Sequence, residues 1–151
     1  MPLNGRPATR ETQLRMRGRL HDTCLLCGDK NPVGLKLDFA VAEDGGVSVT
    51  FMCHFRFEGY KGCLHGGMAA ALLDSAMSNC LFAHGIAAFT AEMTIKYKKP
   101  VRCGRKALVT AHIEKDLAPL YIVKGEISQE GQTLVLAEAK FMESDSLNPA
   151  P

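Results

Sequence analysis

Hydrophobic and polar residues alternate along most of the chain beyond Leu35. In a strand with one buried face, every second side chain points to the core, so this alternation predicts β-structure. Six strands are predicted, over residues 35–41, 47–57, 91–97, 107–113, 121–127 and 135–141. The run Asp44-Gly45-Gly46 predicts a hairpin turn between the first two strands.

One long apolar segment, residues 66–83, lies between the second and third strands. Its apolar residues cover more than one stripe of a helix, and Gly85 stands where a C-terminal cap is expected. Such a helix must be covered on several sides. A single antiparallel sheet of five or six strands, curled around the helix, satisfies both patterns and predicts an α+β fold.

Length and charge exclude several classes of protein. The 151 residues predict one domain. Eighteen Lys and Arg residues against 16 Asp and Glu leave a net charge of +2, which is too balanced to indicate a nucleic-acid partner. The apolar segment contains Asp74, which would cost about 2.5–3.5 kcal/mol at the centre of a bilayer. We therefore expect a buried core helix and no membrane partner.

Residues 1–20 carry five arginines against one acid, Glu11. We predict a flexible basic segment over residues 1–20, the folded domain over 21–143 and a flexible tail over 144–151. The first twenty residues lack the apolar core of a secretory signal. An organelle transit peptide is the alternative, although Pro2, Gly5 and Pro7 would break its helix early. Six cysteines without an export signal favour a reducing compartment, so a cytoplasmic location is expected.

Asp74 is the only charged residue of the apolar helix. Burying an unpaired carboxylate costs several kcal/mol, so Asp74 either has a function or lies on an exposed stripe of the helix. Helical spacing would form that stripe from Asp74, Ser75, Ser78 and Phe82.

The run His65-Gly66-Gly67 stands at the start of the same helix. A helix N-terminus presents unpaired N–H groups and the positive end of the helix dipole, and glycine lets a substrate oxygen approach the backbone closely. Such a site stabilises an oxygen that becomes negative during acyl transfer. The alternative is a glycine pair that only allows close packing at a helix start.

Eight residues separate Gly66 from Asp74, which places them about 12 Å apart along one helix. Reacting groups must approach to about 3 Å, so one substrate carbonyl cannot meet both residues of one chain. If both are catalytic, two antiparallel copies of the helix must pair across a symmetric interface. This spacing predicts a homodimer or homotetramer.

Two runs, from Gly62 to Ala76 and from Thr90 to Pro100, resemble the hotdog-fold acyl-CoA thioesterases. The shared features are His-Gly-Gly, an acid nine residues after the histidine, and a strand that ends in an aromatic residue and a proline. The likeness is greatest to the phenylacetyl-CoA and 4-hydroxybenzoyl-CoA thioesterases. It implies a hotdog fold, in which an antiparallel sheet wraps around one long central helix, and an enzyme that hydrolyses a thioester.

The resemblance also implies roles for single residues. Asp74 matches the catalytic carboxylate, which acts as general base or as nucleophile. Gly66 matches the glycine whose N–H binds the thioester oxygen, and His65 matches the histidine that helps to hold that oxygen. Thr90 matches a serine that positions water in some members, and Ser78 matches a threonine with this role in another branch.

The chain departs from the family at Gly59, where several members have Asn or Gln to activate the carbonyl. Either Glu58 or Tyr60 takes this role, or the carbonyl is activated less strongly. A slow enzyme and a non-catalytic protein that binds acyl-CoA are therefore the alternatives to an efficient hydrolase.

Positive charge follows the strand of Thr90, at Lys98, Lys99, Arg102, Arg105 and Lys106. A cationic rim would bind the phosphates of coenzyme A, and a solvated turn is the alternative. We expect substrate contacts from Lys98, Lys99 and Arg102, and from Gly67 and Met68 at the helix start.

Cys24 and Cys27 form a Cys-x-x-Cys pair. Structural zinc needs four ligands, and the sequence contains no second close pair among His21, Cys53, His54, Cys63 and His65. A redox motif normally opens a helix, whereas turn-forming residues follow Cys27. We predict an ordered loop over residues 24–34 and no metal, with zinc as the alternative. The predicted hydrolysis needs no cofactor, since coenzyme A is part of the substrate.

Overall fold

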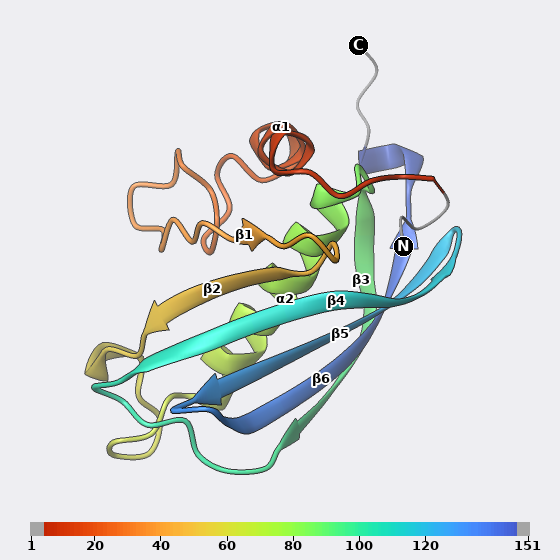
Figure 1. Cartoon of the computed structure of the whole chain (residues 1–151). Coiled ribbons are helices and arrows are strands. Elements are labelled where there is room, and N and C mark those ends of the chain that lie inside the picture. Colours follow the sequence, from red (N-terminus) through yellow and green to blue (C-terminus); the bar gives the residue numbers. More distant parts are fainter. Residues whose placement is uncertain (1–4, 148–151) are drawn as a thin grey trace.

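The computed structural model describes residues 5–147. Two helices, α1 (Arg10–Leu20) and α2 (Gly66–Ala83), accompany six strands. The strands are β1 (Ala40–Val41), β2 (Val47–Met52), β3 (Ala88–Tyr97), β4 (Lys106–Leu117), β5 (Leu120–Gln129) and β6 (Gln132–Glu143). They form one antiparallel sheet in the order β1-β2-β4-β5-β6-β3, which curls around α2 (Figure 1). This is the sheet around a central helix that the sequence predicts.

Helix α2 has the predicted bounds. It begins after His65, whose side chain caps the first turn, and it is followed by Gly85 in the left-handed region (φ 73°). The side chains of Leu72, Leu73 and Met77 are fully buried against the sheet. A Cβ atom at Gly125 of β5 would lie 3.2 Å from the side chains of Leu73 and Met77, so glycine lets the sheet approach α2 closely there.

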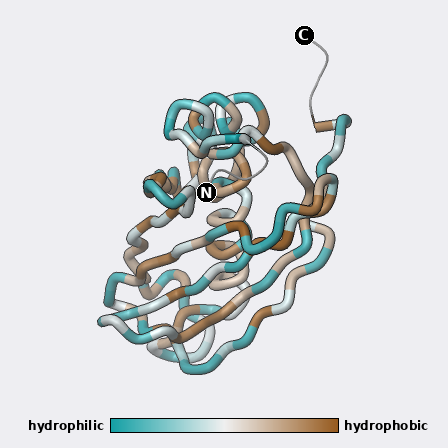
Figure 2. The backbone as a smooth tube through the Cα atoms, turned by 45° about the vertical axis from the view of Figure 1, so that its right-hand side comes forward, coloured by the Kyte–Doolittle hydropathy of each residue, from teal (hydrophilic) through white to brown (hydrophobic). Residues whose placement is uncertain are grey.

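Hydropathy alternates along the strands, as Figure 2 shows. In β5 every second residue is buried along the whole strand, and the others are half-buried. The four strands after α2 are all present, so the period-two pattern predicted them correctly. No helix within residues 5–147 has the length and apolar character needed to cross a membrane.

The first two predicted strands are shorter in the structure. Residues 35–39 do not pair with the sheet, because the N–H groups of Leu35 and Leu37 bond to the carbonyls of Leu25 and Leu26 in the N-terminal loop. Beyond Met52 the chain leaves β2 and forms a 3₁₀ turn at Phe55–Phe57. In residues 35–39 the alternation reflects burial against the core, and burial does not require a sheet partner. Beyond Cys53 the alternation no longer matches burial, since Phe55 is exposed.

The prediction of a flexible segment over residues 1–20 is wrong for Arg10–Leu20, which forms α1. Thr9 caps this helix, and α1 packs along α2. Its buried face includes Gln13, which donates hydrogen bonds to the carbonyl of Phe39 and to the side chain of Asn79. A helix that buries polar side chains has no apolar stripe, so the hydrophobic pattern could not reveal it. Residues 1–4 lie outside the described part.

The predicted tail, residues 144–151, is described only to Leu147. It contains a 3₁₀ turn at Asp145–Leu147, and Leu147 packs on the small apolar cluster of Met16, Phe82 and Ala87. The remaining four residues lie outside the described part.

Candidate functional site

Asp74 and Thr90 form a hydrogen-bonded pair between α2 and β3. The Thr90 hydroxyl donates to Oδ1 of Asp74 at 2.6 Å. Asp74 is half-buried and Thr90 is exposed, so the pair lies at the molecular surface. Within residues 5–147 no other hydrogen bond reaches the Asp74 carboxylate, which leaves Oδ2 accessible to a water molecule or a substrate.

A β-bulge turns Thr90 toward α2. Glu92 pairs with Lys140 of β6 on the outer face of the sheet, whereas Thr90 pairs with Phe141, which is fully buried on the inner face. The register shifts between Thr90 and Glu92, where Ala91 is the extra residue. In a regular strand Thr90 and Glu92 would share a face, so the bulge is what brings Thr90 to Asp74.

The exposed stripe considered for α2 does not exist. Ser75, Ser78 and Phe82 are all at least nine-tenths buried, because α1 and the following loop cover this side of the helix. The ring of His21 packs edge-on against Phe82, with centroids 4.9 Å apart. Burial lowers the pKa of His21, and the negative charge of Asp74 opposes this effect. Ser78 makes no hydrogen bond to Asp74 within the described residues.

The N-terminus of α2 presents donors to the surface. Nδ1 of His65 accepts a hydrogen bond from the N–H of Gly67 at 2.8 Å, so the neutral imidazole carries its proton on Nε2. The N–H of Gly66 has no acceptor within residues 5–147. The hydroxyl of Tyr97, at the end of β3, donates to the carbonyl of Gly66 at 2.8 Å. The sequence marks Tyr97 as the aromatic end of its strand, but no sequence pattern indicates this contact.

A hollow of about 320 Å³ lies at this helix end, lined by Gly59, Tyr60, Leu64, His65 and Gly66. The carboxylate of Glu58 accepts a hydrogen bond from the N–H of Gly62, so Glu58 stabilises the loop to which it belongs. Tyr60 is 90% exposed at the rim of the hollow. A Cβ at position 59 would lie 3.3 Å from the Cα of His65, so a larger residue there would crowd His65.

One of the basic residues, Arg102, lies beside the segment that lines the hollow. The N–H of Leu64 bonds to the carbonyl of Val101, and Arg102 contacts the sulfur of Cys63. The N–H groups of Lys98 and Lys99 instead bond to the carbonyl of Leu134. Lys98, Lys99 and Arg102 are all exposed. Arg105 instead forms an ion pair with Glu130, and Lys106 begins β4.

The two residues expected to contact substrate at the helix start differ in exposure. Gly67 is exposed, whereas Met68 is half-buried and packs against the main core. Burial raises the pKa of the Cys53 thiol to about 11 and that of the Cys80 thiol to about 12. Both thiols stay protonated at neutral pH.

A profile of the thioesterase superfamily matches residues 61–136. The chain belongs to the thioesterase superfamily. The match includes the His-Gly-Gly turn, Asp74, Thr90 and the basic residues at 98–102. The family resemblance predicted from the sequence is therefore confirmed.

Curated relatives of this thioesterase-superfamily chain include two mammalian proteins. Mouse acyl-coenzyme A thioesterase 13 is 28% identical over 81 residues, which are 52% of this chain and 58% of that protein. Rat acyl-coenzyme A thioesterase THEM4 is 32% identical over 85 residues, 54% of this chain and 36% of that protein. The chain thus spans less than two thirds of either relative.

Solved structures confirm the hotdog fold for this thioesterase-superfamily chain. The Escherichia coli PaaI protein from the phenylacetic acid degradation operon superposes with a TM-score of 0.72 at 21% identity, over 88% of this chain and 96% of that chain. The smu.793 protein of Streptococcus mutans, bound to acetyl CoA, has a TM-score of 0.69 at 23% identity, over 77% and 94%.

Proposed function

We propose that this chain is an acyl-CoA thioesterase whose active site is shared between two subunits. The observation that carries the proposal is the Thr90–Asp74 pair, on the helix that also presents the unpaired N–H of Gly66. Family membership supports thioester hydrolysis as the reaction. The separation of about 12 Å between Gly66 and Asp74 along α2 requires the second subunit.

In this mechanism the thioester oxygen accepts hydrogen bonds from the N–H of Gly66 and from Nε2–H of His65. Asp74 of the facing subunit, oriented by Thr90, removes a proton from a water molecule as that water attacks the carbonyl carbon. The negative charge that develops on the oxygen is stabilised at the helix N-terminus. The carbon–sulfur bond then breaks, and the departing thiolate of coenzyme A takes the proton back from Asp74. The products are a carboxylic acid and free coenzyme A.

The edge strand β3 provides a surface for the second subunit. It pairs with β6 on one side only, and it exposes Phe89 and Tyr97 at its two ends. Antiparallel pairing of β3 with the β3 of a second subunit would supply partners for the unpaired N–H and C=O groups of this edge. With the two-fold axis between Met93 and Thr94, Thr90 would lie opposite the partner subunit's Tyr97. Asp74 would then face the helix start that this tyrosine contacts. The same pairing is compatible with a dimer or with a dimer of dimers.

Acyl-CoA is the proposed substrate because of the charge beside the hollow. Arg102 contacts the segment that leads into α2, and Lys98 and Lys99 are exposed a few residues before Arg102 in the chain. Cations at a site mouth attract phosphate groups. The curated relatives are named acyl-coenzyme A thioesterases, and the related smu.793 protein holds acetyl CoA. The reaction as proposed uses groups of the chain alone, and it is expected to take place in the cytoplasm.

Thiol release from short, aromatic and long acyl-CoAs tests the activity. We expect turnover of at least one class, and a loss of at least about 10³-fold in Asp74→Asn. Full activity in Asp74→Asn would refute the role of Asp74. If the wild type binds coenzyme A but releases no thiol above background, the chain is instead the non-catalytic binder.

Co-expression of two inactive variants tests the shared site. In Gly66→Pro the N–H donor is lost but the helix is kept, because proline is favoured at the first helical position and His65 already has extended backbone (ψ 133°). Gly66→Pro and Asp74→Asn are each expected to be inactive alone. Mixed dimers would contain one site without either defect, so random pairing should restore about a quarter of wild-type activity. No recovery in confirmed mixed dimers would refute the shared site.

A further inference from the structure

Three side chains with metal-binding atoms converge where α1 meets the following loop. His21 lies at the C-terminal end of α1, and Cys24 and Cys27 lie in the loop. One ligand atom of each lies within 4.8 Å of the others. Cys27 is fully buried, and the other two are half-buried. The sequence placed the cysteines near each other but did not single out His21 as the third member.

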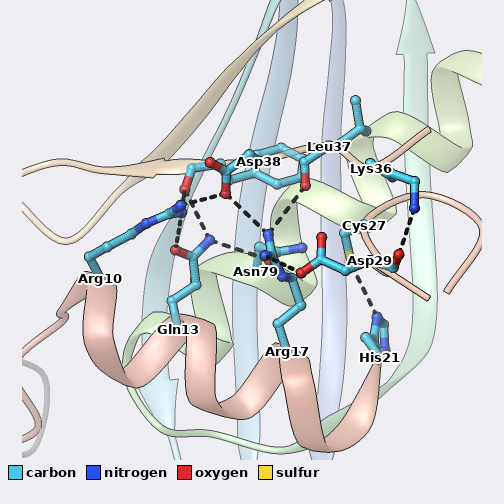
Figure 3. A network of polar contacts seen from close by, with 11 residues as sticks. Arg10, Gln13, Arg17, His21, Cys27, Asp29, Lys36, Leu37, Asp38 and Asn79 are labelled. Carbon is cyan, nitrogen blue, oxygen red and sulfur yellow. Dashed lines mark hydrogen bonds and ion pairs between the residues drawn. The ribbon is translucent and has the colours of Figure 1, made fainter. Parts of the chain in front are cut away.

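The distance between His21 and Cys27 fits tetrahedral zinc. Nδ1 of His21 lies 3.5 Å from Sγ of Cys27 (Figure 3). Zinc–nitrogen bonds of about 2.0–2.1 Å and zinc–sulfur bonds of about 2.3 Å at a tetrahedral angle put these two atoms about 3.6 Å apart. A set of one histidine and two thiolates binds zinc in preference to magnesium or calcium.

Backbone contacts hold the turn around Cys24. The N–H of Leu26 bonds to Sγ of Cys24 at 3.4 Å, a contact that stabilises a thiolate. The N–H of Gly28 closes the turn by bonding to the carbonyl of Cys24. A Cβ at position 28 would lie only 2.4 Å from the backbone nitrogen of Cys24, so a larger residue cannot occupy this turn.

Helix α2 supplies polar groups behind the cluster. Burial raises the pKa of the Cys27 thiol to about 11, and the side chains of Asn79 and Ser75 oppose this shift. The Ser75 hydroxyl is buried and has no hydrogen bond of normal geometry within residues 5–147. A zinc-bound thiolate is a stronger acceptor for such a hydroxyl than a neutral thiol is.

We infer that His21, Cys24 and Cys27 bind one Zn²⁺ ion. Binding replaces the two thiol protons with the metal, so two protons are released for each ion bound, and a solvent molecule completes the four-coordinate site. The ion would join the end of α1 to the loop that covers α2. Near the cluster, the guanidinium of Arg17 donates hydrogen bonds to the carboxylates of Asp29 and Asp38, and the ammonium of Lys36 donates one to the carbonyl of Asp29 (Figure 3). The three ligands lie outside the proposed catalytic groups.

Metal content of the full chain, without a histidine tag, tests this inference. After reduction and addition of Zn²⁺, gel-filtered protein is expected to hold one zinc per chain by mass spectrometry of the metal. Co²⁺ in its place should produce a thiolate-to-cobalt charge-transfer band. Excess Zn²⁺ should raise the melting temperature of the metal-free chain by about 5 °C or more.

Matched variants locate the site. Cys24→Ser and His21→Phe, which keep the shape of each side chain, should weaken zinc binding by at least about tenfold. Cys63→Ser and His54→Ala alter a cysteine and a histidine outside the cluster and should bind as the wild type does. Circular dichroism confirms folding of each variant.

The inference is overturned if the reduced wild type holds no zinc and shows no cobalt band. Unchanged binding in folded Cys24→Ser and His21→Phe would also refute it. Since none of these readouts uses catalysis, they are independent of the proposed hydrolase activity.

Discussion

The hydroxyl of Thr90 donates to the carboxylate of Asp74 at 2.6 Å, across the gap between the edge strand and the central helix. This contact fixes the rotamer of Asp74 and leaves its second oxygen open. It also keeps the oxygen lone pairs of Thr90 available to accept a hydrogen bond from water. Thr90 is therefore a positioning residue in the proposed mechanism.

Removal of the Thr90 hydroxyl should slow hydrolysis. Thr90→Val keeps the shape of the side chain but loses a hydrogen bond to a charged group, so kcat should fall about 10–100-fold. Thr90→Ser restores the hydroxyl and should stay within about threefold of the wild type. Steady-state kinetics on one acyl-CoA decide the matter, and equal rates for the valine and serine variants would contradict the role of Thr90.

Loss of the Tyr97 hydroxyl should loosen the first turn of α2. Tyr97→Phe removes the hydrogen bond to the carbonyl of Gly66. Tyr97 is about half exposed, so the contact is worth about 0.5–1 kcal/mol, or a fall of about 1–4 °C in melting temperature. Tyr60→Phe, at a tyrosine that is almost fully exposed, is the control and should melt with the wild type. A melting temperature for Tyr97→Phe equal to that of the control would argue against this contact.

The docking of α1 should depend on the buried side chain of Gln13. Gln13→Leu leaves the carbonyl of Phe39 and the side chain of Asn79 without this donor, at a cost of about 1–3 kcal/mol. We expect the melting temperature to fall by about 2–10 °C. Gln132→Leu changes an exposed glutamine and serves as control. If both variants melt with the wild type, α1 contributes little to the stability of the domain.

Acid should weaken the attachment of the N-terminal segment through Asp38. Burial alone would raise the pKa of this carboxyl, but hydrogen bonds and charges from Arg10 and Arg17 outweigh burial and hold the pKa below its ordinary value of 3.8. A lowered pKa in the folded state contributes stability above the unfolded pKa, and this contribution is lost as the pH falls through the folded pKa.

The variant Asp38→Asn isolates this effect. At pH 7 the wild type should melt above Asp38→Asn, by only a few degrees because the carboxylate is largely exposed and screened by solvent. As the pH falls below 3.8 and through the lowered pKa of Asp38 in the folded state, the difference should shrink toward zero. Melting curves of both proteins across this range test the prediction, and a difference that persists unchanged in acid would contradict it.

The sequence alone predicted the central helix and the four strands that follow it. The strands alternate because one face of the sheet is buried, and the helix is apolar all around because it is buried on all sides. In both cases the burial of each residue shows directly in its hydrophobicity. The same pattern overextended the first two strands, because residues 35–39 are buried without pairing to the sheet. It also missed α1, whose inner face is formed partly by Gln13 and Arg17.

The candidate site was likewise predicted only in part from the sequence. Asp74 stood out in the sequence because a charge in an apolar helix is costly, and Gly66 stood out because it begins that helix. The meeting of Thr90 with Asp74 depended on the register shift at Ala91, which reverses the facing of the strand and leaves no mark in the alternation. The third member of the cysteine cluster was likewise decided by the end of α1, which brings His21 back against Cys27. Local patterns record which side chains are buried, whereas register and helix docking depend on contacts between distant segments, and only the tertiary structure contains them.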